Sequence, residues 1–491
     1  MSARLRRGSD LLRQGRMPEA ADVLQRLVDD APHLADAWYN LGYARRRSGD
    51  YDAALAAYDR ALGLGAAAPE QIHLNRAAIL SEHLQQYRQA EDALHSALRA
   101  RPGYPAALLN LGNLHEERGQ RAPAVAAYRA LLASTDPEAA ALAIDAHTRL
   151  LHLEPPERLD DPRIAQLRRY ATSPAIEQDR RASALYALAH ACDRLGGFDA
   201  AFAFAADANR CAHGRQPRYL PERTQARFAD IARVFARPRP AGAAPGGVAP
   251  LFVCGMFRSG SSLIEQVLAQ HPRIRAGGEL DVLPRLAARR LAPFPAAAAA
   301  WSEAEFDALA DDYRRRTAAL LAETPQARYL TDKRPDNFAL IGLIKRMFPD
   351  ARIVHTCRHP LDNGLSIFMQ HLDPRQFGYA GALSDIGHYY GAYRRLMAHW
   401  TRIYPDSIHH FDYDAFVAAP EPTLRALLAF LELPWDPACL EFHRSSAPVR
   451  TGSYWQVRQP LHRAASGRWR MYRAHLLPLV QALGAAGVEI D

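Results

Sequence analysis

Apolar and small residues recur at a regular interval in the first part of the chain, with one conspicuous alanine about every 34 residues. Each alanine is followed four positions later by a large apolar residue and preceded twelve positions earlier by a small one. The alanines are Ala20, Ala54, Ala90 and Ala124, the large residues are Leu24, Tyr58, Leu94 and Tyr128, and the small ones are Gly8, Gly42, Ala78 and Gly112. The pattern predicts antiparallel helix pairs in which small residues allow close crossing.

This period is typical of tetratricopeptide repeats. We expect repeats at about 4–34, 38–68, 72–104 and 108–138, with a degenerate copy near 184–210. They predict an all-α solenoid over residues 1–236. The concave face of such a solenoid is expected to bind a peptide or protein, and a packing role, for example in a homodimer, is the alternative.

The pattern changes after residues 237–249, whose proline and glycine content predicts a linker. Residues 251–254 are then a short apolar run with the length of a buried strand, and apolar residues from Ile264 to Leu268 recur at helical spacing. We therefore expect residues 250–491 to form an α/β domain with a parallel sheet, resembling the P-loop folds.

The turn between this strand and this helix is bounded by Gly255 and Gly260. Such a turn aims backbone N–H groups and the positive end of the helix dipole at one point, which suits a phosphate. The glycine spacing matches the Walker A loop, but Ser261 occupies the position of its lysine. We interpret the loop as a site for a nucleotide without β and γ phosphates; a purely structural turn is the alternative.

The composition is that of an ordinary globular protein, with 48% hydrophobic and 23% charged residues. Of the 61 basic residues only Lys333 and Lys345 are lysines. This skew indicates a G+C-rich bacterial genome, so the net charge of +8 is weak support for nucleic-acid binding, which we do not expect. No signal-peptide pattern and no long apolar run is present, so we expect no membrane span and a cytoplasmic location.

The five cysteines are scattered and include no Cys-x-x-Cys pair, so they predict neither a disulfide framework nor a zinc site. No metal is expected at the candidate active site described below either, since side chains there can supply both the general base and the charge that stabilises the leaving group.

Several motifs follow in order between about Pro250 and Trp469. They are Phe257-Arg-Ser-Gly-Ser-Ser-Leu263, His271-Pro272, Gly278-Glu279, Thr331-Asp-Lys-Arg-Pro-Asp-Asn-Phe338, and Arg352-Ile-Val-His-Thr-Cys-Arg-His-Pro-Leu-Asp362 with Ser366. This series resembles the sulfotransferase family, whose sulfuryl donor is 3′-phosphoadenosine 5′-phosphosulfate (PAPS), which leaves as 3′-phosphoadenosine 5′-phosphate (PAP). Glu279 makes the tyrosylprotein sulfotransferases the nearest branch. Together with the repeats, the chain resembles bacterial sulfotransferases that carry tetratricopeptide repeats.

The resemblance implies a donor site with two anion-binding ends. The 5′ end would be held by Arg258, Ser259, Gly260, Ser261 and Ser262. The 3′-phosphate would be held by Arg358 and Ser366, because a guanidinium with a neighbouring hydroxyl suits a terminal phosphate.

Further donor contacts are expected from Tyr413 and from a C-terminal loop that includes Ser453 and Arg458. Gln459 stands in that loop where the tyrosylprotein enzymes have lysine, which is a departure from the family pattern.

The resemblance also assigns catalytic roles. Glu279 would take the proton of the acceptor hydroxyl, and Lys333, assisted by Arg258, would stabilise the leaving oxygen. His355 is a rival base, but it lies inside an apparent strand. The expected acceptor is a tyrosine of a peptide or protein, with a carbohydrate, lipid or small phenol as alternatives. A P-loop kinase and a non-enzymatic adaptor are weaker alternatives.

Overall fold

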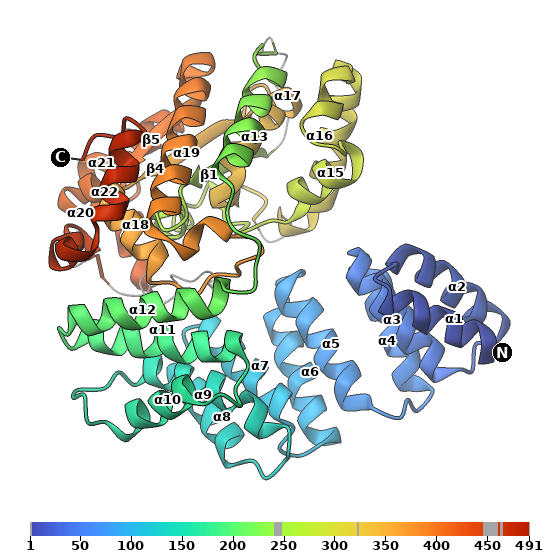
Figure 1. The fold of residues 1–491 in the computed structure, drawn as a ribbon. Helices are drawn as coiled ribbons and strands as arrows, with labels where there is room; N and C mark the ends of the chain where they lie inside the picture. Colours follow the sequence, from blue (N-terminus) through green and yellow to red (C-terminus); the bar gives the residue numbers. More distant parts are fainter. Residues whose placement is uncertain (1, 240–247, 322–323, 445–459, 462–464, 491) are drawn as a thin grey trace. The chain divides into compact units, whose positions relative to one another are not determined.

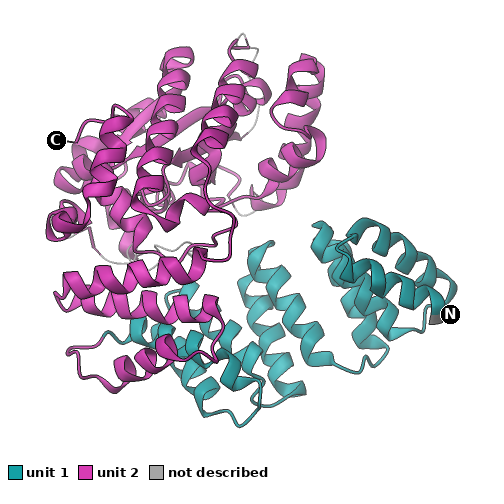
Figure 2. Ribbon diagram, viewed as in Figure 1, with its two compact units in different colours: residues 1–155 teal, residues 156–491 magenta. Residues whose placement is uncertain are grey.

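A computed structural model describes residues 2–239, 248–321, 324–444, 460–461 and 465–490. The chain divides into two compact units, residues 1–155 and residues 156–491, which Figure 2 shows in different colours. Among the described helices, none combines the length and the apolar character needed to cross a lipid bilayer.

Unit 1 consists of helices joined by short turns (Figure 1). They are α1 (Ser2–Arg13), α2 (Met17–Asp30), α3 (Ala35–Ser48), α4 (Tyr51–Gly63), α5 (Pro69–Glu82), α6 (Tyr87–Ala100), α7 (Pro105–Glu117), α8 (Arg121–Ala133) and α9 (Ala139–Leu153). The repeat helices pair as the sequence period predicts. A Cβ added at Gly42 would lie 2.6 Å from the Tyr58 ring, and one at Gly112 would lie 2.3 Å from the Tyr128 ring. The small positions therefore let consecutive helices cross closely, and the helical repeats are confirmed.

Unit 2 is built on a five-stranded, all-parallel sheet with the order β2-β3-β1-β4-β5. The strands are β1 (Ala249–Gly255), β2 (Ile274–Arg275), β3 (Tyr329–Lys333), β4 (Arg352–Cys357) and β5 (Ile408–Asp412). The central strand β1 is buried from Leu251 onward because helices cover both faces. The predicted α/β domain with a parallel sheet is therefore confirmed.

The α-helices of unit 2 precede and alternate with these strands. They are α10 (Pro162–Thr172), α11 (Gln178–Arg194), α12 (Phe198–His213), α13 (Pro221–Val234), α14 (Ser261–Leu268), α15 (Val282–Arg290), α16 (Glu303–Thr317), α17 (Ile341–Met347), α18 (Pro360–Phe368), α19 (Leu383–Ile403), α20 (Tyr413–Ala418), α21 (Pro420–Phe430) and α22 (Leu477–Ala485). In Figure 1, α13 and α19 lie next to each other in front of the sheet.

The boundary between the units differs from the expected domain boundary. We expected the solenoid to extend to residue 236, but α10–α13 belong to unit 2. In α12, the Asn209 amide donates a hydrogen bond of 2.9 Å to the Phe368 carbonyl of α18. Phe235, just after α13, packs so closely on Gly342 that a Cβ there would lie 2.4 Å from the Phe235 Cβ. The helix pair α11–α12 thus covers the α/β core.

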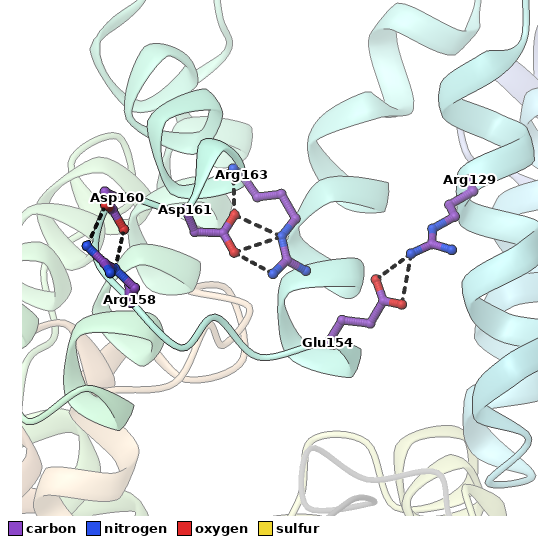
Figure 3. Close-up of polar contacts among 6 residues, drawn as sticks. All are labelled: Arg129, Glu154, Arg158, Asp160, Asp161 and Arg163. Atoms are coloured by element: carbon purple, nitrogen blue, oxygen red, sulfur yellow. Dashed lines mark hydrogen bonds and ion pairs between the residues drawn. The ribbon is translucent and has the colours of Figure 1, made fainter.

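Figure 3 shows polar contacts near the division, each formed by residues of one unit. Arg129 pairs with Glu154 at 2.9 Å in unit 1. In unit 2, the Asp161 side chain caps α10 by accepting a 2.8 Å hydrogen bond from the Arg163 backbone N–H. The division falls within the Pro155-Pro156 pair, which cannot continue α9, and α10 begins further on with its own cap at Asp161.

The packing of Phe235 predicts that Phe235→Ala destabilises the α/β unit. Phe235 is 1% exposed and contacts the same core as the sheet helices, so its truncation should cost about 3–5 kcal/mol. Thermal unfolding should show a lower Tm for this variant. The matched control is Leu159→Ala, because Leu159 is 53% exposed and its truncation should leave the Tm nearly unchanged. Equal Tm values for both variants would contradict the assignment of α13 to this unit.

Candidate active site

The loop between β1 and α14 is held from beneath by β4. The Ser259 hydroxyl lies 2.6 Å from the Thr356 hydroxyl, which donates to the Cys254 carbonyl at 3.1 Å. A Cβ at Gly255 would lie 2.4 Å from the Thr356 carbonyl oxygen, and Gly260 has φ +101°. The glycines are therefore required by close approach and by backbone conformation. The Ser259 N–H is engaged within the loop, donating to the Met256 carbonyl at 3.1 Å, and the amides of residues 260–262 lie at the start of α14.

Arg258, Ser366 and Arg358, which the sequence places in three separate segments, meet beside this loop. The Arg258 Nε donates to the Ser366 hydroxyl at 3.1 Å. Arg358 donates through one Nη to the Arg258 carbonyl at 3.4 Å and through the other to the Ala465 carbonyl. Its guanidinium also lies 5.1 Å from the centre of the Tyr413 ring. The candidate donor-site residues Arg258, Arg358, Ser366 and Tyr413 thus form one cluster.

This cluster is strongly positive. Desolvation, and then the charge of Arg358, lower the pKa of Arg258 to about 10. The Arg358 Nε is buried and has no hydrogen-bond partner among the residues that the structure describes. Two repelling guanidiniums and a buried, unsatisfied N–H make the cluster complementary to an anion with several acceptor oxygens.

Glu279 and Lys333 lie at the end of β3 and form an ion pair. The Lys333 Nζ donates to the Glu279 Oε1 at 2.6 Å; the lysine side chain is fully buried, whereas the glutamate side chain is 37% exposed. The Lys333 backbone N–H donates to the Gly278 carbonyl at 2.9 Å, which fixes the turn that presents Glu279. We expected separate roles for these two residues, and their direct contact could not be predicted from the motifs.

Glu265 on α14 was missed by the sequence reasoning, although it is only 4% exposed. Its Oε1 accepts hydrogen bonds from the Gly278 N–H at 2.9 Å and from the Thr331 hydroxyl at 2.6 Å. The sequence carries no signal for this residue, because Glu265 and Gln266 stand between Ile264 and Val267, where an amphipathic helix normally has its exposed polar residues.

Two aspartates anchor the C-terminal segment that begins at Ala465. Asp362 accepts hydrogen bonds from the backbone N–H groups of Gly467 at 2.6 Å and Trp469 at 2.7 Å. Asp414 accepts from the Ser466 hydroxyl at 2.6 Å and from the His359 N–H at 2.8 Å. These contacts bring Ala465 to Arg358. The other C-terminal candidates, Ser453 and Arg458, lie outside the described residues, as does Gln459.

His355, the rival base, is buried in β4 with both ring nitrogens engaged. Nε2 contacts the Tyr393 hydroxyl, and Nδ1 lies 2.7 Å from the His410 Nδ1. Burial lowers the pKa of both imidazoles, and the charge of Arg394 lowers them further.

Cys357 completes a group of three donors that could approach a metal. However, two nitrogen ligands of a tetrahedral zinc are about 3.3 Å apart. The shorter separation between the histidines is that of a hydrogen bond.

Comparison with known proteins adds two family matches. Residues 250–437 match the model of a sulfotransferase family, and residues 5–71 and 82–144 match a tetratricopeptide repeat model. An uncharacterized protein of Aquifex aeolicus is 33% identical over 343 residues, covering 66% of this chain and 44% of that protein. Protein-tyrosine sulfotransferase 1 of Danio rerio is 26% identical over 213 residues, covering 39% of this chain and 55% of the relative.

Among solved structures, the sulfotransferase domain of the Synechococcus PCC 7002 olefin synthase matches with a TM-score of 0.37 and 19% identity. The match covers 51% of this chain and all of that domain. With respect to the two relatives from Aquifex aeolicus and Danio rerio, this chain spans about half of their length.

The close approach at Gly255 predicts that Gly255→Ala disrupts the loop. The contacted atom is a backbone carbonyl of a central strand, which cannot turn away, so the free energy of unfolding should fall by at least about 1–3 kcal/mol. The matched control is Gly484→Ala in α22, where a Cβ would meet no atom within 4 Å. It should be neutral or stabilising by about 0.5–1 kcal/mol. A Gly255→Ala protein as stable as the wild type in urea unfolding would refute the described loop conformation.

Proposed function

We propose that this chain, whose residues 250–437 match the model of a sulfotransferase family, transfers the sulfuryl group of PAPS to a hydroxyl of an acceptor. The observation that carries the proposal is the meeting of Arg258, Arg358 and Ser366 at the edge where Lys333 and Glu279 form their ion pair. The cluster suited to an anion then lies at the same edge of the sheet as the Lys333 ammonium and the Glu279 carboxylate. Group transfer to a hydroxyl needs this combination, because the donor must be bound, the leaving group stabilised and the hydroxyl proton accepted.

The residues present fit PAPS at both ends of the nucleotide. The buried Arg358 Nε has no partner among the described residues, and Arg358 contacts Arg258, which holds the Ser366 hydroxyl; this supports a terminal phosphate there. The amides of residues 260–262 with the hydroxyls of Ser261 and Ser262 support binding of the 5′ end. Without a lysine at position 261 the loop is poorly suited to a nucleoside triphosphate, which argues against a kinase.

When bound, PAPS would supply an activated sulfuryl group whose leaving group is a phosphate oxygen. Lys333 would turn its ammonium from Glu279 toward the charge that develops on the leaving oxygen. Its complete burial keeps that charge in a low-dielectric surrounding, where it stabilises more strongly than in water. Glu279, released from the pair and 37% exposed, would accept the proton of the acceptor hydroxyl. Arg258 would assist at the loop.

For the acceptor we propose a tyrosine of a peptide or protein. The support is the similarity to protein-tyrosine sulfotransferases of several animals and the presence of a repeat unit of a type that binds peptides. A carbohydrate, lipid or small phenol is the alternative acceptor. Incubation with labelled PAPS and a host lysate would identify the class by whether the label enters protein.

Binding of PAP should stabilise the protein against heat. At a PAP concentration about 100 times the dissociation constant, linkage gives about 2.7 kcal/mol, equivalent to a Tm increase on the order of 4 °C for a unit of this size. ATP with magnesium should give a much smaller shift. Arg358→Ala should abolish the PAP effect, whereas Arg315→Ala, which removes an exposed arginine elsewhere on the unit, should keep it. No shift with PAP at millimolar concentration would overturn the proposed donor site.

Glu279→Gln should bind PAP as the wild type does and lose turnover by about 10²–10⁴-fold, because the amide keeps the shape of the side chain but cannot take the proton. The measurement is transfer of label from PAPS to an acceptor, with PAP thermal shifts on the same samples. Glu303→Gln, which changes an exposed carboxylate outside the site, is the control. Wild-type turnover in Glu279→Gln would exclude Glu279 as the base.

A further inference from the structure

Glu265 connects two parts of the site that are separate in the sequence. It lies on α14, the helix whose first turn belongs to the phosphate loop, and its carboxylate reaches across to the turn before Glu279 and to strand β3. Among the described contacts, no other side chain uses one oxygen to hydrogen-bond both the turn before Glu279 and strand β3.

The contacts around Glu265 form a short network. Its Oε1 accepts from the Gly278 N–H at 2.9 Å and from the Thr331 hydroxyl at 2.6 Å. The same hydroxyl oxygen accepts the Gly277 N–H at 3.0 Å. The Gly278 carbonyl in turn accepts the Lys333 N–H at 2.9 Å. Both amides before Glu279 are thus satisfied by Glu265 and Thr331.

The turn has little room for an alternative arrangement. A Cβ at Gly277 would lie 2.2 Å from the Thr331 carbonyl, and Gly278 has φ +73°. Thr331 is fully buried, so water could not easily replace its hydroxyl. Loss of the network would leave buried N–H groups unsatisfied, and the turn would relax by moving Glu279.

We propose that Glu265, acting through Thr331 and the amides of Gly277 and Gly278, is a positioning residue that sets Glu279 against Lys333 and couples this pair to the phosphate loop. The inference rests on the proposed function for what Glu279 and Lys333 do. It differs from that function in assigning the orientation of the base to a carboxylate on the donor-binding helix.

Burial opposes a charged Glu265 and raises its pKa, while the positive charge of Lys333 and the two hydrogen bonds lower it. The positive charge of Lys333 therefore stabilises two carboxylates. It contacts that of Glu279 directly and attracts that of Glu265 without contact.

The test uses Thr331→Val in the full chain, since valine keeps the shape and removes only the hydroxyl. The turnover number for label transfer from PAPS to a tyrosine-containing peptide, and for release of label to water, should fall about 10-fold or more. The KM for PAPS and the PAP thermal shift should stay within about twofold. Thr331→Ser should restore turnover, and Glu265→Ala combined with Thr331→Val should cost no more than the larger single loss, because both act on one turn.

The matched control is Thr317→Val, which removes another buried hydroxyl, one that bonds the Tyr313 carbonyl at 3.0 Å within α16. It should leave turnover unchanged. Hydrogen exchange of the peptide covering residues 276–281, measured with PAP bound, should be faster in Thr331→Val than in Thr317→Val.

The possible failures are distinguishable. If the wild type binds PAP and turns over but Thr331→Val matches it in turnover and in exchange, the positioning role is wrong and the proposed function stands. If Thr331→Val weakens PAP binding in parallel with turnover, the residue supports the donor site and not the base. If the wild type neither binds PAP nor releases label from PAPS, the proposed function fails, while the exchange comparison still decides whether this network holds the turn.

Discussion

The parallel pairing of β1 with β3 on one side and β4 on the other is the constraint on which the site depends. The register places Val253 opposite Lys333 and Gly255 opposite Thr356. Because parallel strands end at the same edge of the sheet, the loop between β1 and α14, Lys333 and the segment that carries Arg358 all lie at that edge. A shift of one residue in the β1–β3 pairing would turn Lys333 to the opposite face of the sheet, and the same shift in the β1–β4 pairing would turn Thr356 away from the loop.

The charges at this edge form two groups, a neutral ion pair and a pair of positive charges. Lys333 is paired with Glu279 at 2.6 Å, whereas Arg358 donates to the Arg258 backbone carbonyl and the two guanidiniums repel each other. Holding like charges together is unfavourable, and the fold tolerates it because the loop is fixed by the Ser259–Thr356 and Cys254–Thr356 contacts beneath. Such an arrangement is suited to an anion, whose binding would relieve the repulsion.

Helices α10–α13, which follow the repeats in the sequence, belong to the α/β unit and not to the repeat unit. An α11–α12 pair with repeat-like spacing provides apolar side chains to the α/β core, with Ala201 and Ala205 fully buried there. Asp193 and Asp199 bind Tyr472 and His475 in the last part of the chain. These helices therefore cover the α/β core of unit 2, and residues 1–155 form unit 1.

The sequence by itself determined the local elements and their order. The helix pairs followed from a period set by small crossing positions such as Gly42 and Gly112, and the strand, turn and helix at Leu251–Leu268 followed from apolar runs bounded by glycine. The candidate site residues could be predicted because the order of motifs along the chain can be read without knowing the fold. They are Arg258, Glu279, Lys333, Arg358 and Ser366. Only the tertiary structure decided that Lys333 pairs with Glu279, that Glu265 bonds Thr331 and Gly278, and that α10–α13 join the second unit. These outcomes depend on which buried polar groups meet and which apolar faces find a partner, and neither is encoded by spacing along the chain.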